Sequence, residues 1–87
     1  MTIYKYPIKI IDTQKVKLPL YAKILTAQMQ GDTLCLWAQV DDTNTDTKER
    51  TIEVFGTGYP MSHDARRYIG TTQMRGGALI WHVFERE

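Results

Sequence analysis

Apolar residues recur mainly at every second position of this chain, a period that predicts β-strands. The pattern is clearest in segment 33–41, which places four apolar side chains on one face: Leu34, Leu36, Ala38 and Val40. The same reading predicts strands at 2–11, 14–18, 22–30, 51–55, 68–74 and 78–85. No segment has a helical stripe of useful length. The fold class is therefore all-β, a small antiparallel barrel or sandwich of six to seven strands with no substantial helix.

Turn residues and breakers refine this assignment. Gly31 and Asp32 predict a hairpin between 22–30 and 33–41, and Gly76 with Gly77 predicts a second one into the last strand. Pro7 indicates that the first strand lies at an edge or is broken, because proline cannot donate to a ladder. Alternation in 22–30 predicts that Ile24 faces one way, and the other face is expected to hold Leu25, Ala27 and Met29.

Segment 41–50 contains no apolar residue and is predicted to be a mobile hairpin loop. Its acidic residues suggest calcium at first sight. The segment lacks the glycine and the terminal glutamate of the common calcium loop, however, so the sequence predicts no metal site.

The segment 55–71 interrupts the strand pattern and carries the candidate binding site. Gly56 and Gly58 permit positive φ and a close approach by a ligand, while Pro60 restricts Tyr59 to extended conformations. The candidate ligand-binding residues are Gly56, Thr57, Gly58, Tyr59, Arg66, Arg67 and Tyr68. The tyrosines would stack on a ring, the arginines would bind phosphate or carboxylate, and the glycine turn would offer backbone N–H groups. The alternative is a tight loop with a solvated basic tip.

The last strand, 78–85, is apolar on both faces. Leu79, Trp81 and Val83 alternate with Ala78, Ile80 and Phe84. Such a strand is either central between packed layers or presents one face to another subunit. Since 87 residues make one domain, 1–87, with a modest core, we expect a homo-oligomer formed through this C-terminal strand.

Charge and cysteine content exclude several classes of protein. Eleven basic and ten acidic residues give a net charge of +1, and no basic run exceeds two residues. Polymeric nucleic acid and anionic membranes are therefore not expected partners. Cys35 has no second cysteine to pair with, and neither a signal peptide nor an apolar membrane span is recognised, so a cytoplasmic protein is expected.

An enzyme is the competing class. Cys35 and His82 resemble a nucleophile and a base, but a mid-strand cysteine is usually an inert small hydrophobe. Phosphodiesterases with two catalytic histidines carry Ser or Thr two positions after each, where this chain has Ala65 and Phe84. His63, beside an aspartate on the loop, leaves acid–base chemistry open. We predict a binding protein with no catalytic residue and no cofactor.

Six segments, in this order, resemble a family of small phage and prophage proteins classed as a domain of unknown function. They are Ile-Tyr-Lys-Tyr-Pro at 3–7, the strands at 22–25 and 36–38, Gly-Thr-Gly-Tyr-Pro at 56–60, Tyr-Ile-Gly-Thr at 68–71 and Trp-His-Val-Phe-Glu at 81–85. The resemblance implies an accessory protein made in the host cytoplasm during infection. The first expectation is a sponge that counters host immunity by sequestering a small anionic, nucleotide-type signal. The alternative is an inhibitor that binds a host defence protein, or a minor structural module of the phage.

Overall fold

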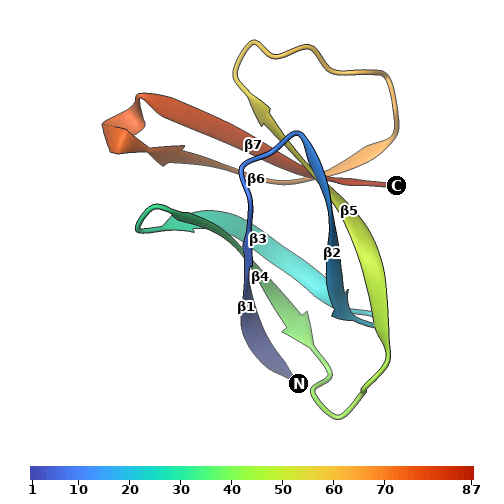
Figure 1. Ribbon diagram of the computed structural model, residues 1–87. Coiled ribbons are helices and arrows are strands. Elements are labelled where there is room, and N and C mark those ends of the chain that lie inside the picture. The colour runs from blue at the N-terminus through green and yellow to red at the C-terminus, as the bar shows by residue number, and fades with distance from the viewer.

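The computed structural model describes residues 1–87 and has two antiparallel sheets that pack face to face (Figure 1). The sheets are not closed into a barrel, so the all-β prediction is confirmed as a sandwich. One sheet has the order β1-β4-β3 and the other the order β2-β5-β7-β6. The elements are β1 (Thr2–Ile8), β2 (Thr13–Pro19), β3 (Lys23–Gln30), β4 (Thr33–Val40), β5 (Thr47–Gly56), β6 (Arg66–Met74), the 3-10 turn η1 (Arg75–Gly77) and β7 (Leu79–Arg86). No helix is long or apolar enough to cross a membrane.

The three-stranded sheet follows the sequence prediction closely. The central strand β4 buries one face completely, with Leu34, Leu36, Ala38 and Val40. β1 is an edge strand, as Pro7 predicted. The hairpin from β3 into β4 turns at Gly31, which has φ +60°.

A β-bulge at Leu25 corrects the predicted face assignment of β3. Ile24 pairs with Ala38, while the next paired residue is Thr26, so Leu25 is the extra residue. The bulge resets the alternation, since two residues oppose one on the partner strand. Ile24 therefore packs into the core together with Ala27, and Leu25 is exposed.

The four-stranded sheet places the doubly apolar strand β7 in its centre, between β5 and β6. Val83 and Trp81 point into the sandwich. The opposite face of β7 carries Ile80, His82 and Phe84, and this surface is the outer face of the four-stranded sheet.

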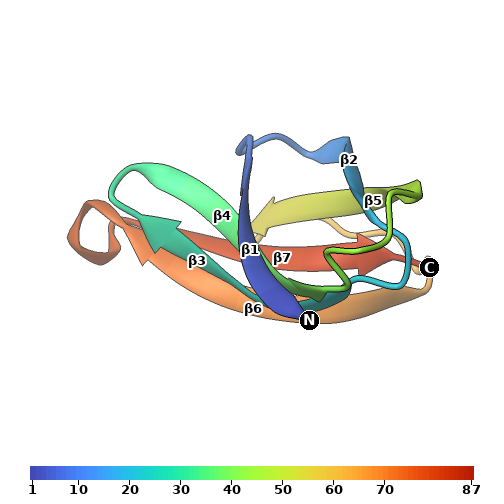
Figure 2. The ribbon, with the colours of Figure 1, turned by 90° about the horizontal axis from the view of Figure 1, so that it is seen from below.

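β3 and β6 lie side by side where one edge of each sheet meets the other (Figure 2). A Cβ on Gly70 would lie 3.2 Å from the carbonyl oxygen of Ala27, so only glycine allows this approach. Nearby, the hydroxyl of Thr72 accepts a hydrogen bond from the backbone N–H of Met29. This side of the sandwich is closed by backbone proximity and not by large side chains.

The predicted loop 41–50 is half loop and half strand. β5 begins at Thr47, so Lys48 and Arg50 lie in the sheet and pair with β2. The loop itself, 41–46, passes from one sheet to the other and is not a hairpin. The prediction was wrong for 47–50 because ladder pairing with β2 and one ion pair order a polar segment that has no apolar side chain.

Candidate functional site

The glycine turn that begins the predicted site packs against its own tyrosine. Tyr59 donates its backbone N–H to the carbonyl of Gly56 across a four-residue turn, and Gly58 supplies the positive φ of +88°. The Tyr59 ring lies on Gly56, where a Cβ would be 2.8 Å from the ring. Tyr59 thereby separates two small cavities of about 230 and 110 Å³, both of which also contact Trp81.

Arg66, one of the predicted ligand-binding residues, is engaged by partners within the protein. Its Nε donates to Glu53, and its two terminal nitrogens donate to the backbone and hydroxyl of Ser62 and to the carbonyl of Asp64. The guanidinium also lies 5.2 Å from the centre of the Phe55 ring. Four of its five N–H donors are thus directed at the loop and the sheet.

Thr57 and Tyr68 belong to a hydrogen-bonded row on the outer face of the four-stranded sheet. His82 contacts the hydroxyl of Thr57 through Nε2 at 2.7 Å and that of Thr71 through Nδ1 at 3.0 Å. The Tyr68 hydroxyl lies 2.6 Å from the Thr71 hydroxyl, and its ring meets Phe84 edge to face. Which nitrogen of His82 donates and which accepts depends on the tautomer of its ring.

The predicted residues are therefore brought together only in part. Gly56 and Tyr59 lie at the end of β5, whereas Thr57, Arg66 and Tyr68 lie on the outer face. Successive strand residues point to opposite faces, so Arg67 projects to the inner side, beside Glu85. Of the two adjacent arginines, only Arg67 reaches an open cavity.

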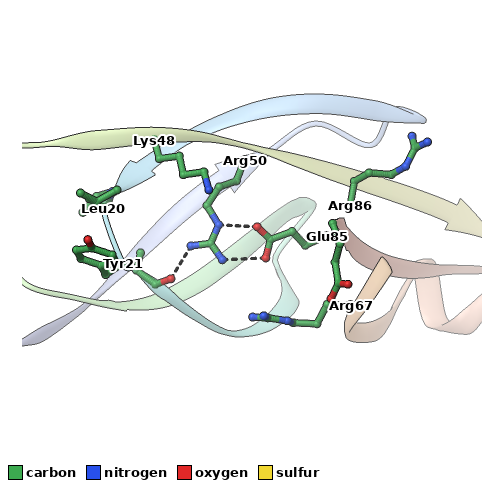
Figure 3. Close-up of a pocket in the computed structure, with 10 residues that line it drawn as sticks. Leu20, Tyr21, Lys48, Arg50, Arg67, Glu85 and Arg86 are labelled. Atoms are coloured by element: carbon green, nitrogen blue, oxygen red, sulfur yellow. Dashed lines mark hydrogen bonds and ion pairs between the residues drawn. The ribbon is translucent and has the colours of Figure 1, made fainter. Parts of the chain in front are cut away.

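That cavity, of about 460 Å³, lies at the end of the sandwich where β6 begins and β7 ends. The turn between β2 and β3 and the first half of β5 complete its walls (Figure 3). Its lining residues are Pro19, Leu20, Tyr21, Ala22, Lys48, Arg50, Arg67, Glu85, Arg86 and Glu87. We call it the basic cavity, because four of these side chains are cationic and two are anionic.

An ion pair forms the centre of the basic cavity. Arg50 donates two parallel hydrogen bonds to the carboxylate of Glu85 and a third to the carbonyl of Ala22. The hydrogen bonds from Arg50, then the charges of Arg50, Arg67 and Lys48, hold the pKa of Glu85 below its ordinary value, against the opposing effect of burial. Glu85 is therefore ionised at neutral pH and cancels the charge of Arg50.

Lys48 and Arg67 remain as cations without an anionic partner of their own. Both are close enough to lower the pKa of Glu85, and both side chains are exposed to the cavity (Figure 3). Arg86 is already paired with Asp64 and Glu53. An ammonium and a planar guanidinium on opposite strands suit a phosphate or a carboxylate.

Sequence reasoning missed Lys48, Arg50, Glu85 and Tyr21. For Lys48 and Arg50, the strand periodicity contained a usable signal. Extending the inward phase of Ile52 and Val54 backwards by two steps gives Arg50 and Lys48, so both would have pointed into the sandwich end.

The catalytic pair considered from the sequence is not formed. Cys35 is buried in the three-stranded sheet and directs its thiol to the carbonyl of Thr33, whereas His82 lies on the outer face of the other sheet. No cluster of three or more His, Cys, Asp or Glu side chains is arranged to hold a metal ion.

The chain belongs to the family described as Domain of unknown function (DUF7352), whose model matches residues 1–87. No curated protein matches it, and no solved structure does.

Proposed function

We propose that this family member binds a small phosphate-bearing molecule in the basic cavity and releases it unchanged. The observation that carries the proposal is the pair of cations, Lys48 and Arg67, that face a concave space without an anionic partner. Its volume of about 460 Å³ falls within the range of small-molecule sites.

The cationic side chains of the lining outnumber the acidic ones, Glu85 and Glu87, which favours an anionic ligand. Arg50 is neutralised by Glu85, so a ligand that approached Arg50 alone would compete with an existing bidentate pair. Lys48 and Arg67 each offer a charge-assisted hydrogen bond, which typically contributes about 1.5–3 kcal/mol. A small ligand has few atoms to offer, so its affinity depends on a few such contacts.

The composition of the lining supports binding over catalysis. It contains no Ser, Thr, Cys or His, so a hydroxyl or thiol nucleophile activated by a histidine base is not present in it. The proposed role extends the phage resemblance: an accessory protein in the host cytoplasm that counters immunity by sequestering a nucleotide-type signal. The predicted site moves accordingly, with Arg67 kept and Arg66 replaced by Lys48.

The test is titration calorimetry of the purified protein against pyrophosphate, ADP-ribose and a panel of cyclic di- and trinucleotides. At least one compound is expected to bind, and heat release followed by mass measurement should return it unchanged. Lys48→Ala and Arg67→Ala should each weaken binding by roughly ten- to hundredfold.

Lys15→Ala is the matched control, since it removes the same charge from the edge strand β2, away from the cavity. It should leave affinity unchanged. Equal losses of affinity in Lys15→Ala and Lys48→Ala would show that only the overall charge of the protein matters. That result would overturn the site assignment. A panel in which nothing binds would overturn the function and leave the alternative, inhibition of a host defence protein or a minor structural role in the phage.

The expected homo-oligomer is a second proposal, and the fold restricts where it can form. Trp81 and Val83 are used by the chain's own core, which leaves the outer face of β7. There Ile80 and Phe84 are half-buried and Tyr68 is 57% exposed. We propose that a second copy of this chain covers this outer face.

A further inference from the structure

Tyr21 has a backbone conformation that its side chain does not favour. It lies in the turn Pro19–Ala22 with φ +64°, a position at which glycine or asparagine is normally found. Its side chain does not offset this strain by packing, because the residue is 90% exposed. Backbone strain of this kind often occurs at ligand-binding sites, which points to a functional role for the Tyr21 side chain.

The turn that carries Tyr21 is fixed on both sides. Ala22 donates its N–H to the carbonyl of Pro19 at 3.0 Å, and Leu20 donates to the carbonyl of Asp46 at 2.9 Å. Arg50 holds the carbonyl of Ala22 from inside the cavity. The ring of Tyr21 is therefore placed at the rim by its backbone and keeps a free surface.

The Arg50–Glu85 pair lies between two parts of the basic cavity. Leu20, Tyr21 and Lys48 stand on one side of it, and Arg67 and Arg86 on the other (Figure 3). A phosphate held by Lys48 and Arg67 would leave the remainder of its molecule directed towards Tyr21.

We infer that Tyr21 is a stacking platform for the base of a nucleotide whose phosphates lie between Lys48 and Arg67. This inference rests on the proposed function. It narrows the proposed ligand from any phosphate-bearing molecule to one that carries both a phosphate and a nucleobase. A stacked base typically strengthens binding by roughly 5- to 100-fold, with little dependence on which base it is.

The experiment compares ADP with pyrophosphate, which carries a similar diphosphate without the base. Wild-type protein should bind ADP roughly 5- to 100-fold more tightly than pyrophosphate. Tyr21→Gly should reduce ADP binding to the pyrophosphate level and leave pyrophosphate binding unchanged. Tyr21→Phe keeps the ring and should keep the preference.

Stability provides an independent measurement. Tyr21→Gly removes the unfavourable φ and should raise Tm by about 4 °C or more. Arg75→Gly is the matched control, since Arg75 is the other non-glycine residue with positive φ, at +54°, in the turn at the far end of β6. It should also raise Tm but should not change ADP binding.

The outcomes separate the two claims. Failure of ADP, pyrophosphate and every compound of the panel described above to bind would overturn the proposed function. Equal binding of the two by wild-type protein, or an equal loss of both in Tyr21→Gly, would overturn the stacking role and leave the anion site intact.

Discussion

Arg66 and Glu53 form an ion pair beneath the loop 57–65, with Nε and Oε1 2.6 Å apart and each side chain only 8% exposed. Glu53 lies in the middle of β5, on the outer face of the four-stranded sheet, and Arg66 begins β6. Because the same guanidinium also binds Ser62, it joins the loop to the sheet. A second cation, Arg86, stands 3.4 Å from the other carboxylate oxygen.

Arg66→Ala is accordingly expected to destabilise the protein. Removing one partner of a buried pair leaves the other charge uncompensated and typically costs about 3–5 kcal/mol, which the more distant Arg86 would partly offset. Urea unfolding measures the difference. Arg67→Ala, which removes a cavity cation, should lie within about 0.5 kcal/mol of wild type. Equal destabilisation by both variants would contradict this assignment.

Gly56→Ala should destabilise the protein by about 1–3 kcal/mol, because its new methyl group would overlap the ring of Tyr59. The cost depends on that ring. In a Tyr59→Ala background the same substitution should cost much less, and a double-mutant cycle by thermal unfolding gives the coupling. Additive effects would show that the ring does not rest on Gly56 in solution.

Acid should weaken the Arg50–Glu85 pair. Because the pKa of Glu85 is lower in the folded protein than its ordinary value of 4.5, the pair's contribution is present above that value and is lost as the pH falls through the folded pKa. Glu85→Gln should thus be less stable than wild type at about pH 7, and the gap in unfolding free energy should narrow as the pH falls below 4.5.

The comparison controls for the other acids. The pKa values of Asp41 and Asp64 are also lowered, mainly by hydrogen bonds from Thr43 and Ser62. Both remain in Glu85→Gln and cancel in the difference between the two proteins. A gap in unfolding free energy that stayed constant with pH would show that Glu85 is not specifically stabilised in its ionised form.

Shortening the loop at 42–45 should leave both Tm and anion binding nearly unchanged, since this stretch is mostly exposed, its hydrogen bonds are local and its ion pair between Asp42 and the N-terminus is on the surface. Extending the deletion through Arg50 should abolish binding and destabilise the fold. Differential scanning calorimetry and titration of both variants test this boundary. A large loss of affinity on the short deletion would place the function in the loop.

Ile80→Asp should dissociate the expected homo-oligomer, because it places a charge on the outer face of β7. Trp81→Ala, on the inner face, should chiefly lower the free energy of unfolding by creating a cavity. For a completely buried tryptophan this loss is about 3–5 kcal/mol. It should be smaller here because Trp81 is only partly buried. Light scattering and melting curves separate the two effects. Wild-type protein that measures as a 10.1 kDa monomer at micromolar concentration would refute the oligomer.

Local chemistry explains why much of the fold was predictable. Period-two alternation in β4, the glycines of the two hairpin turns and the proline of β1 act over a few residues, and each gave the correct element. No pattern in the sequence indicated the two β-bulges. At Leu25 and Ile69 one extra residue is accommodated where β3 and β6 approach each other, and that approach depends on both sheets.

The amino-acid sequence by itself determined the strand content and the buried face of β4. Only the tertiary structure decided which of two neighbouring arginines faces a cavity, and that Tyr21, Lys48 and Arg67 share one. These three residues come from the turn after β2, from β5 and from β6. Their proximity results from packing one sheet on the other, whereas sequence periodicity specifies only the face on which each side chain lies.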